Sequence, residues 1–146
     1  MEQRVNIITL GVRDLDASRR FYLDGLGWTP KLDVPNEVIF LQVGHGLLLS
    51  LWAREEMAAE AGEFYRGDAA LPITLSHNVA DDAEVAVVLD SATAAGGTVL
   101  VPATKRDWGG VSGFFADPDG YRWEVAHNPG LTYGSDGTIT FGAPPT

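Results

Sequence analysis

Few side chains in this sequence could act as catalytic groups. There is no cysteine, which excludes thiolate nucleophiles, thiolate metal ligands and disulfides. The three histidines are His45, which stands between two glycines in an expected turn, His77 and His127. No spacing joins any of them to a serine and an aspartate as a hydrolytic triad. We predict structural or surface roles for all three.

Glu124 is the strongest candidate for a polar functional group. Strict alternation along the expected strand 121–127 places Arg122, Glu124 and Ala126 on one face. One interpretation is an ordinary solvated or salt-bridged pair at a strand surface, with Arg122 as the neighbour and partner of Glu124. The other makes Glu124 an acid/base or a ligand-anchoring group in a pocket.

Two tryptophans stand where they could line such a pocket. Trp52 follows Ser50 by two residues, so both share one face of an expected strand. Trp108 precedes two glycines at the expected start of another strand. Apolar walls with few polar groups describe many small-molecule sites, and they also describe an ordinary core. Together, Trp52 and Trp108 favour a flat or aromatic ligand.

The composition limits the classes of function. A chain of 146 residues, 45% hydrophobic, is ordinary for a globular domain. No apolar run is long enough to span a bilayer, and the N-terminus lacks a signal-peptide pattern. A net charge of −10, with only ten scattered Lys and Arg, argues against nucleic acid. We expect a cytoplasmic protein that binds a small molecule and no membrane.

An internal repeat organises the chain. Segments 5–12 and 72–79 align without a gap, and an acid follows two residues after the closing valine of each, at Asp14 and Asp81. Each acid is a predicted helix N-cap, and Asp81 with Glu84 forms a capping-box pattern. Glycines that suit helix C-caps follow, and then three strand signals in each half.

The repeat predicts an α+β fold of two βαβββ units in a single domain, residues 1–146. Unit one is expected at 4–53, a partly helical linker at 54–70, unit two at 71–127, and a tail at 128–146 with a short strand near 138–141. Expected strands after the first helix are 28–34, 37–43 and 47–52, and after the second helix 98–103, 110–115 and 121–127.

Two stretches resemble a known family. They are TLGVRDLDASRRFY at 9–22 and FADPDGYRWE at 115–124. Both are similar to segments of the vicinal oxygen chelate superfamily, which contains glyoxalases, bleomycin-resistance proteins and extradiol dioxygenases. With the repeat, the resemblance covers about residues 4–128. It implies that the two units form a curved mixed-sheet cup. In metal-dependent members, residues of the first and last strands of the units hold a divalent ion in that cup.

The resemblance assigns four positions of this chain to the site. Ile7 and Thr74 stand on the first strands, and Ser50 and Glu124 on the last. Only Glu124 is a good ligand, whereas catalytic divalent sites need about three protein N or O ligands. We therefore predict no metal and no cofactor. The predicted ligand-binding residues are Ile7, Ser50, Trp52, Thr74, Trp108, Arg122 and Glu124, with Glu124 also a candidate acid/base.

Three functional hypotheses follow. The first is a metal-independent small-molecule-binding protein, with a resistance or sequestration role. The second is a metal-dependent lyase, isomerase or dioxygenase of the glyoxalase type, in which the ion acts as a Lewis acid. The third is a metal-free enzyme with Glu124 as acid/base. The resemblance, together with exposed sheet edges, also implies a homodimer.

Overall fold

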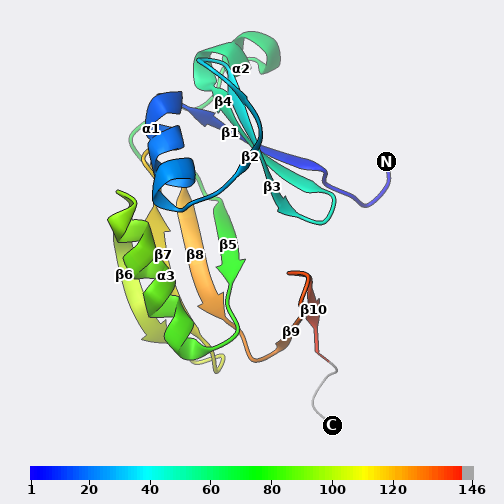
Figure 1. Cartoon of the computed structure of the whole chain (residues 1–146), viewed down its shortest axis with the longest axis vertical. Coiled ribbons are helices and arrows are strands. Elements are labelled where there is room, and N and C mark those ends of the chain that lie inside the picture. The colour runs from blue at the N-terminus through cyan, green and yellow to red at the C-terminus, as the bar shows by residue number, and fades with distance from the viewer. Residues whose placement is uncertain (143–146) are drawn as a thin grey trace. The chain divides into compact units, whose positions relative to one another are not determined.

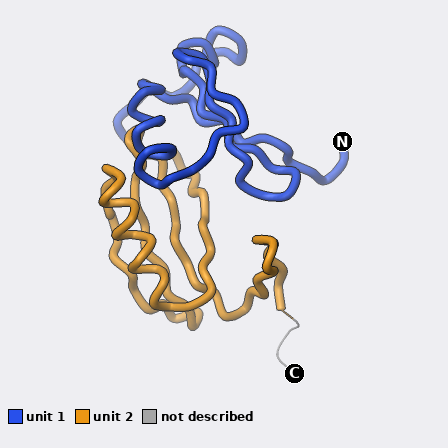
Figure 2. Tube along the Cα trace, viewed as in Figure 1, with its two compact units in different colours: residues 1–69 blue, residues 70–146 orange. Residues whose placement is uncertain are grey.

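The structure is a computed structural model that describes residues 1–142. Contacts within the chain divide it into two compact units, Met1–Ala69 and Ala70–Thr146 (Figure 2). Each unit contains one four-stranded mixed sheet and a helix between its first two strands. The predicted α+β fold of two βαβββ units is therefore confirmed.

Unit one begins with β1 and ends with a helix that follows its last strand (Figure 1). Its elements are β1 (Ile7–Val12), α1 (Leu15–Arg19), the π-helical segment η1 (Arg20–Gly25), β2 (Pro30–Val34), β3 (Val38–Gly44), β4 (Leu47–Ala53) and α2 (Arg54–Ala61). The strand order is β1-β4-β3-β2, with β1 parallel to β4 and the other pairs antiparallel.

Unit two repeats this topology. Its elements are β5 (Thr74–Asn78), α3 (Asp82–Ala94), β6 (Thr98–Lys105), β7 (Val111–Ala116) and β8 (Arg122–His127). The strand order is β5-β8-β7-β6, again with the first strand parallel to the last. In both sheets the first strand therefore pairs with the last strand of its unit.

The predicted acidic caps start both main helices. The Asp14 carboxylate accepts hydrogen bonds from the main-chain N–H groups of Asp16 and Ala17, and Asp81 caps α3 in the same way. Glu84 completes a variant of the capping box, because its carboxylate accepts from the N–H of Ala80, one residue before the cap.

The helix of unit one widens into a π-helical turn, which the sequence pattern did not predict. The N–H of Leu26 donates to the carbonyl of Phe21 at 2.9 Å, the five-residue spacing of a π-helix. Phe21 and Tyr22 are both almost fully buried, and their rings meet edge to face at 4.9 Å. The wider turn thus accompanies the burial of two adjacent aromatic rings.

The segments outside the repeat differ in detail from the expectation. Helical character was expected around 57–64, but α2 starts directly at the end of β4 and stops before Gly62, whose φ is +91°. In the tail, the expected strand is β10 (Ile139–Phe141), and it pairs with an unpredicted strand, β9 (Leu131–Tyr133). The last part of the tail, 143–146, lies outside the described residues.

One face of each sheet supplies the core. In unit one the buried apolar strand residues come from alternate positions: Leu10, Val12, Ile39, Leu41, Leu49 and Leu51. In unit two α3 packs on β6, β7 and β8, and the buried apolar residues of the helix and the core side of the sheet include Val85, Leu89, Ala92, Phe115, Trp123 and Val125. Residues at the intervening positions form the other face of each sheet. Among the helices of residues 1–142, none has the length and apolar character needed to cross a membrane.

Candidate functional site

The non-core face of the unit-two sheet carries Glu124. Ser76 of β5 and Phe114 of β7 are both paired with Glu124. Paired residues point to the same side of a sheet, and alternate residues return to that side. This surface, which we call the Glu124 face, is formed by Thr74, Ser76 and Asn78 of β5, by Arg122, Glu124 and Ala126 of β8, and by Ser112, Phe114 and Ala116 of β7.

One carboxylate oxygen of Glu124 is held and the other is available. The Ser76 hydroxyl donates a hydrogen bond to Oε2 of Glu124 at 2.9 Å. Within residues 1–142, Glu124 has no other hydrogen bond and no ion pair. The side chain is half-buried. A positioned carboxylate with a free Oε1 can accept a hydrogen bond or a proton from a bound molecule.

Arg122 shares the Glu124 face but is not the ion-pair partner of Glu124. No carboxylate of the described chain pairs with Arg122. The two residues are two positions apart on one strand, about 6.6 Å along it, whereas Ser76 lies directly across from Glu124. The salt bridge that one interpretation assigned to Arg122 and Glu124 is therefore not formed in the described part of the chain. Thr74 stands beside Arg122 in the register, so three of the predicted ligand-binding residues share this face.

A second guanidinium lies on the Glu124 face. Arg106 follows β6, and its Nε–H donates to Oγ of Ser112 at 2.8 Å, while Nη2 donates to the Ser112 carbonyl at 3.3 Å. Ser112 is only 2% exposed, so the anchor itself is buried. The N–H of Arg106 also donates to the carbonyl of Gly110 at 2.9 Å, which closes the β6–β7 hairpin.

Trp108 lies in the loop of that hairpin rather than at the start of a strand. Its ring covers Gly110, because a Cβ placed there would collide with the indole and with the carbonyl oxygen of His127. Gly110 faces Arg106 across the hairpin, so their side-chain directions match. The indole, half exposed, therefore lies at the edge of the Glu124 face.

The cross-strand row of Ser76, Glu124 and Phe114 in unit two has a counterpart in unit one, with an uncharged residue at its centre. Ser50 of β4 pairs with Thr9 of β1 and with Phe40 of β3. A hydroxyl on one side and a phenyl ring on the other therefore flank the central residue in both units. That central residue is a hydroxyl in unit one and a carboxylate in unit two.

The remaining predicted residues of unit one also share that face. Ile7 and Trp52 are each two positions from this central row, on β1 and β4. Ile7 is 47% exposed and Trp52 is half-buried, whereas Ser50 is buried at 3%. Ile7, Ser50 and Trp52 thus form a mainly apolar surface. Convergence of the predicted residues of both units on one cavity stays a prediction.

The strand histidines lie on the core side of the unit-two sheet. His77 pairs with Val125, and His127 is two residues further along β8. Partial burial lowers the pKa of His77, an effect opposed by the carboxylate of Glu84. Nδ1 of His127 lies 2.6 Å from a carboxylate oxygen of Asp82. Neither ring points toward the Glu124 face, in agreement with the structural roles predicted for them.

Asp82 connects α3 to two strands and should make stability depend on acid pH. Hydrogen bonds from His127 and then Lys105 hold the pKa of Asp82 below its ordinary value of 3.8. A depressed folded-state pKa contributes stability above the unfolded-state pKa, and that contribution disappears as pH falls through the folded-state pKa. We expect Asp82→Asn to show a shallower loss of unfolding free energy between about pH 5 and pH 2, measured by urea denaturation.

Asp90→Asn is the matched control, because Asp90 is an exposed carboxylate of the same helix with no partner among residues 1–142. It should keep the acid dependence of the parent chain. Equal pH profiles for Asp82→Asn and the parent would contradict the assignment.

The donor set at the four positions implied by the resemblance does not fit a divalent metal ion. Ile7 has no donor atom, Ser50 and Thr74 offer neutral hydroxyls, and one oxygen of Glu124 already accepts from Ser76. In the described part of the chain, no three His, Asp or Glu residues are grouped to hold an ion. About three N or O ligands are needed for a catalytic site.

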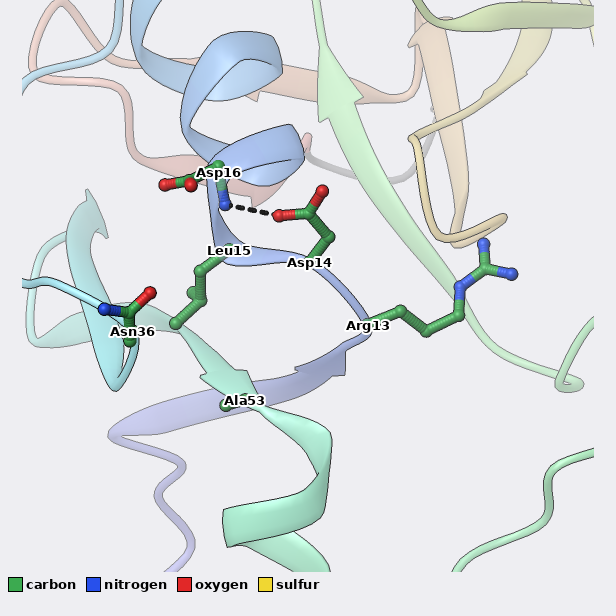
Figure 3. Close-up of a pocket in the computed structure, with 6 residues that line it drawn as sticks. All are labelled: Arg13, Asp14, Leu15, Asp16, Asn36 and Ala53. Carbon is green, nitrogen blue, oxygen red and sulfur yellow. Dashed lines mark hydrogen bonds between the residues drawn. The ribbon is translucent and has the colours of Figure 1, made fainter.

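A pocket of about 200 Å³ lies in unit one, where β1 leads into α1 (Figure 3). It is lined by Arg13, Asp14, Leu15, Asp16, Asn36 and Ala53, none of which is a predicted site residue. The Asp14 carboxylate already accepts from the N–H of Asp16 at 2.8 Å, so the helix start is occupied by its own cap. This pocket lies at the capped start of α1, whose N–H groups are already bonded to Asp14. We therefore place the candidate site on the Glu124 face.

Sequence reasoning missed four residues of this face: Ser76, Arg106, Ser112 and Phe114. One of them, Ser76, could have been predicted from the sequence. The gap-free repeat aligns Ser76 with Thr9, and parallel pairing of first and last strands puts these residues beside Glu124 and Ser50. Arg106 and Ser112 depend on the register of a bulged hairpin, which the sequence does not specify.

Comparison with known proteins agrees with this geometry. The family model described as Glyoxalase/Bleomycin resistance protein/Dioxygenase superfamily matches residues 4–125. Two units of identical strand order define the fold class. The chain belongs to the glyoxalase/bleomycin resistance protein/dioxygenase superfamily.

Several solved structures are similar to the chain. A glyoxalase-related enzyme from Fulvimarina pelagi is 42% identical, with a TM-score of 0.87, over 97% of this chain and 100% of that one. A lactoylglutathione lyase from Agrobacterium tumefaciens is 25% identical, with a TM-score of 0.64, over 86% and 94%. A family enzyme from Burkholderia phytofirmans, at 16% identity and a TM-score of 0.72, covers 84% and 96% and supports the fold alone. No curated protein matches the chain.

Proposed function

We propose that this protein binds a small organic molecule without a divalent metal ion, and that the Glu124 face supplies the polar contacts. The observation that carries the proposal is the state of Glu124. Its carboxylate is positioned by Ser76, flanked by the Phe114 ring and left with one free oxygen. Small-molecule sites combine a few placed polar groups with apolar surface in this way.

Other residues supply the apolar part of the proposed binding surface. Trp108 offers half of its indole at the edge of the Glu124 face. In unit one, the face that includes Ile7, Ser50 and Trp52 is a second proposed contact surface for a flat or aromatic ligand. A sequestering or resistance role needs only such binding. A cytoplasmic location and a homodimeric assembly are further parts of the proposal.

We expect protein purified without chelator to contain well under one equivalent of transition metal, because one carboxylate replaces too little of an ion's hydration shell. Glu124→Gln should reduce the thermal stabilisation produced by aromatic ligands and leave the metal content unchanged. Elemental analysis and a thermal-shift screen with aromatic compounds and divalent ions are the measurements.

Glu60→Gln is the control, because Glu60 is an exposed glutamate of α2. It should bind like the parent chain. Near-stoichiometric zinc, nickel, manganese or iron that disappears in Glu124→Gln would overturn the metal-independent proposal and restore the metalloenzyme hypothesis.

A metal-free enzyme is the second candidate, favoured by the free Oε1 of Glu124 and by the description of the 42%-identical structure as an enzyme. A general base needs a positioned acceptor within hydrogen-bond reach of its substrate. Turnover of lactoylglutathione in the presence of chelator, lost in Glu124→Gln, would favour this candidate over simple binding. The name of the Agrobacterium structure suggests that probe.

A further inference from the structure

Arg106 is an unusual cation in this protein. Acidic residues outnumber basic ones by 20 to 10, and several arginines are paired with carboxylates, as Arg19 is with Asp33 and Arg66 with Glu55. Arg106 is half-buried, yet no carboxylate of the described chain forms an ion pair with it. A guanidinium that is partly removed from water normally acquires an anionic partner.

The guanidinium of Arg106 is held in one orientation. Nε and Nη2 donate to the hydroxyl and the carbonyl of Ser112, which is 2% exposed. The main chain of Arg106 is fixed on both sides, because its N–H donates to Gly110 and its carbonyl accepts from Gly109 at 3.0 Å. Of the five guanidinium N–H groups, two donate to Ser112. Both N–H groups of Nη1 and one N–H group of Nη2 remain available to a ligand.

The charges of the Glu124 face set the charge of a matching ligand. Arg106 and Arg122 lie on it without carboxylate partners among residues 1–142, and Glu124 is hydrogen-bonded to a neutral hydroxyl. Two guanidiniums and one carboxylate leave one positive charge. A ligand with a single negative charge would neutralise this face, and a planar carboxylate matches the free Nη1/Nη2 edge of Arg106 in a bidentate geometry.

The position of Trp108 indicates which chemical group the ligand carries beside its carboxylate. Its ring lies over Gly110, which is opposite Arg106 in the hairpin, and it is half exposed. An indole beside a cationic anchor can stack on a planar ring whose carboxylate reaches the guanidinium.

We propose that Arg106 binds the carboxylate of a monoanionic aromatic acid, with Trp108 stacked on the aromatic ring. This inference rests on the proposed binding function and specifies its ligand class. Arg106 is then the residue that distinguishes an aromatic acid from its neutral analogues.

Benzoate and benzamide are matched probes, since they have nearly the same shape and differ in charge. Titration would follow the side-chain N–H signals of Arg106 and Trp108 and the backbone signals of β7 and β8 in ¹H–¹⁵N NMR spectra. We expect benzoate to shift both side-chain signals and to bind at least about tenfold more tightly than benzamide, as a charge-assisted hydrogen bond allows.

Arg106→Gln should abolish the preference for benzoate and leave benzamide binding unchanged. Arg106→Lys keeps the charge without the planar fork and should retain part of the preference, which separates a binding defect from a folding defect. Arg20→Gln is the control, because Arg20 is an exposed arginine of η1 whose only ion pair within residues 1–142 is a 3.9 Å contact with Asp14. It should keep the full preference.

The outcomes separate this inference from the proposed function. If both probes bind equally and shift β7 and β8, the carboxylate assignment is wrong while the binding proposal stands. If the preference disappears in Arg122→Gln rather than in Arg106→Gln, the assignment to Arg106 is wrong. If neither probe shifts signals of the Glu124 face at millimolar concentration, both the binding function of this face and the role of Arg106 are contradicted.

Discussion

Replacing Phe21 with alanine is expected to lower the free energy of unfolding by about 3–5 kcal/mol. Phe21 is 1% exposed, and its ring contacts Tyr22 edge to face at 4.9 Å inside the π-helical turn. Truncation removes the buried ring and leaves a cavity that the close-packed interior can only partly fill. Since a typical domain is stable by only about 5–15 kcal/mol, this single change should remove a large share of the total.

Urea denaturation followed by circular dichroism measures this effect as a lower midpoint. Phe141→Ala is the matched control, because it is the same chemical change at a residue that is 86% exposed. A surface change of this kind should stay within about 0.5 kcal/mol. Similar losses for the two variants would show that Phe21 is not part of the core.

Gly110→Ala is expected to cost about 1–3 kcal/mol and to displace Trp108. A Cβ at this position collides with the indole ring, which can swing away, and with the carbonyl oxygen of His127, which belongs to β8 and cannot. The hairpin must therefore shift relative to the strand. Because the carbonyl of Gly110 also accepts from Arg106, the shift should loosen the guanidinium as well.

Unfolding free energy and the Trp108 indole N–H signal are the two measurements for Gly110→Ala. Gly44→Ala is the control, since its nearest neighbour would be the Cβ of Leu47 at 3.8 Å, an ordinary contact. That change should alter stability by no more than about 0.5 kcal/mol. An unmoved Trp108 signal in Gly110→Ala would contradict the packing of the ring on Gly110.

The fold was predictable because its signals are local and occur twice. Acidic caps at Asp14 and Asp81, glycines at the helix ends and apolar alternation in the strands all act over a few residues. Element boundaries in the repeat came within a few residues of the structure. The π-helical turn was missed because it depends on the burial of Phe21 and Tyr22 rather than on a local signal.

The candidate site was only partly predictable. Alternation along β8 placed Arg122 and Glu124 on one face, as the structure shows. It also suggested an ion pair between them, whereas the carboxylate bonds across the strands to Ser76. Arg106 was missed because register shifts between β6 and β7 interrupt alternation, and the expected strand ended at 103, before the hairpin that positions this residue.

The pairing of each first strand with the last strand of its unit has a consequence for folding order. β2, β3 and β4 are joined by short turns and can pair as they emerge, as can β6, β7 and β8, because local closure costs little chain entropy. β1 and β5 must wait, since Ser76 and Glu124, for example, are separated by 48 positions. Until β1 and β5 pair, the edges of β4 and β8 that they will cover can form hydrogen bonds with strands of other chains. In the described part of the chain, the strands of unit one pair with one another within residues 1–69. On a ribosome, β1 can therefore pair with β4 while unit two is still being synthesised.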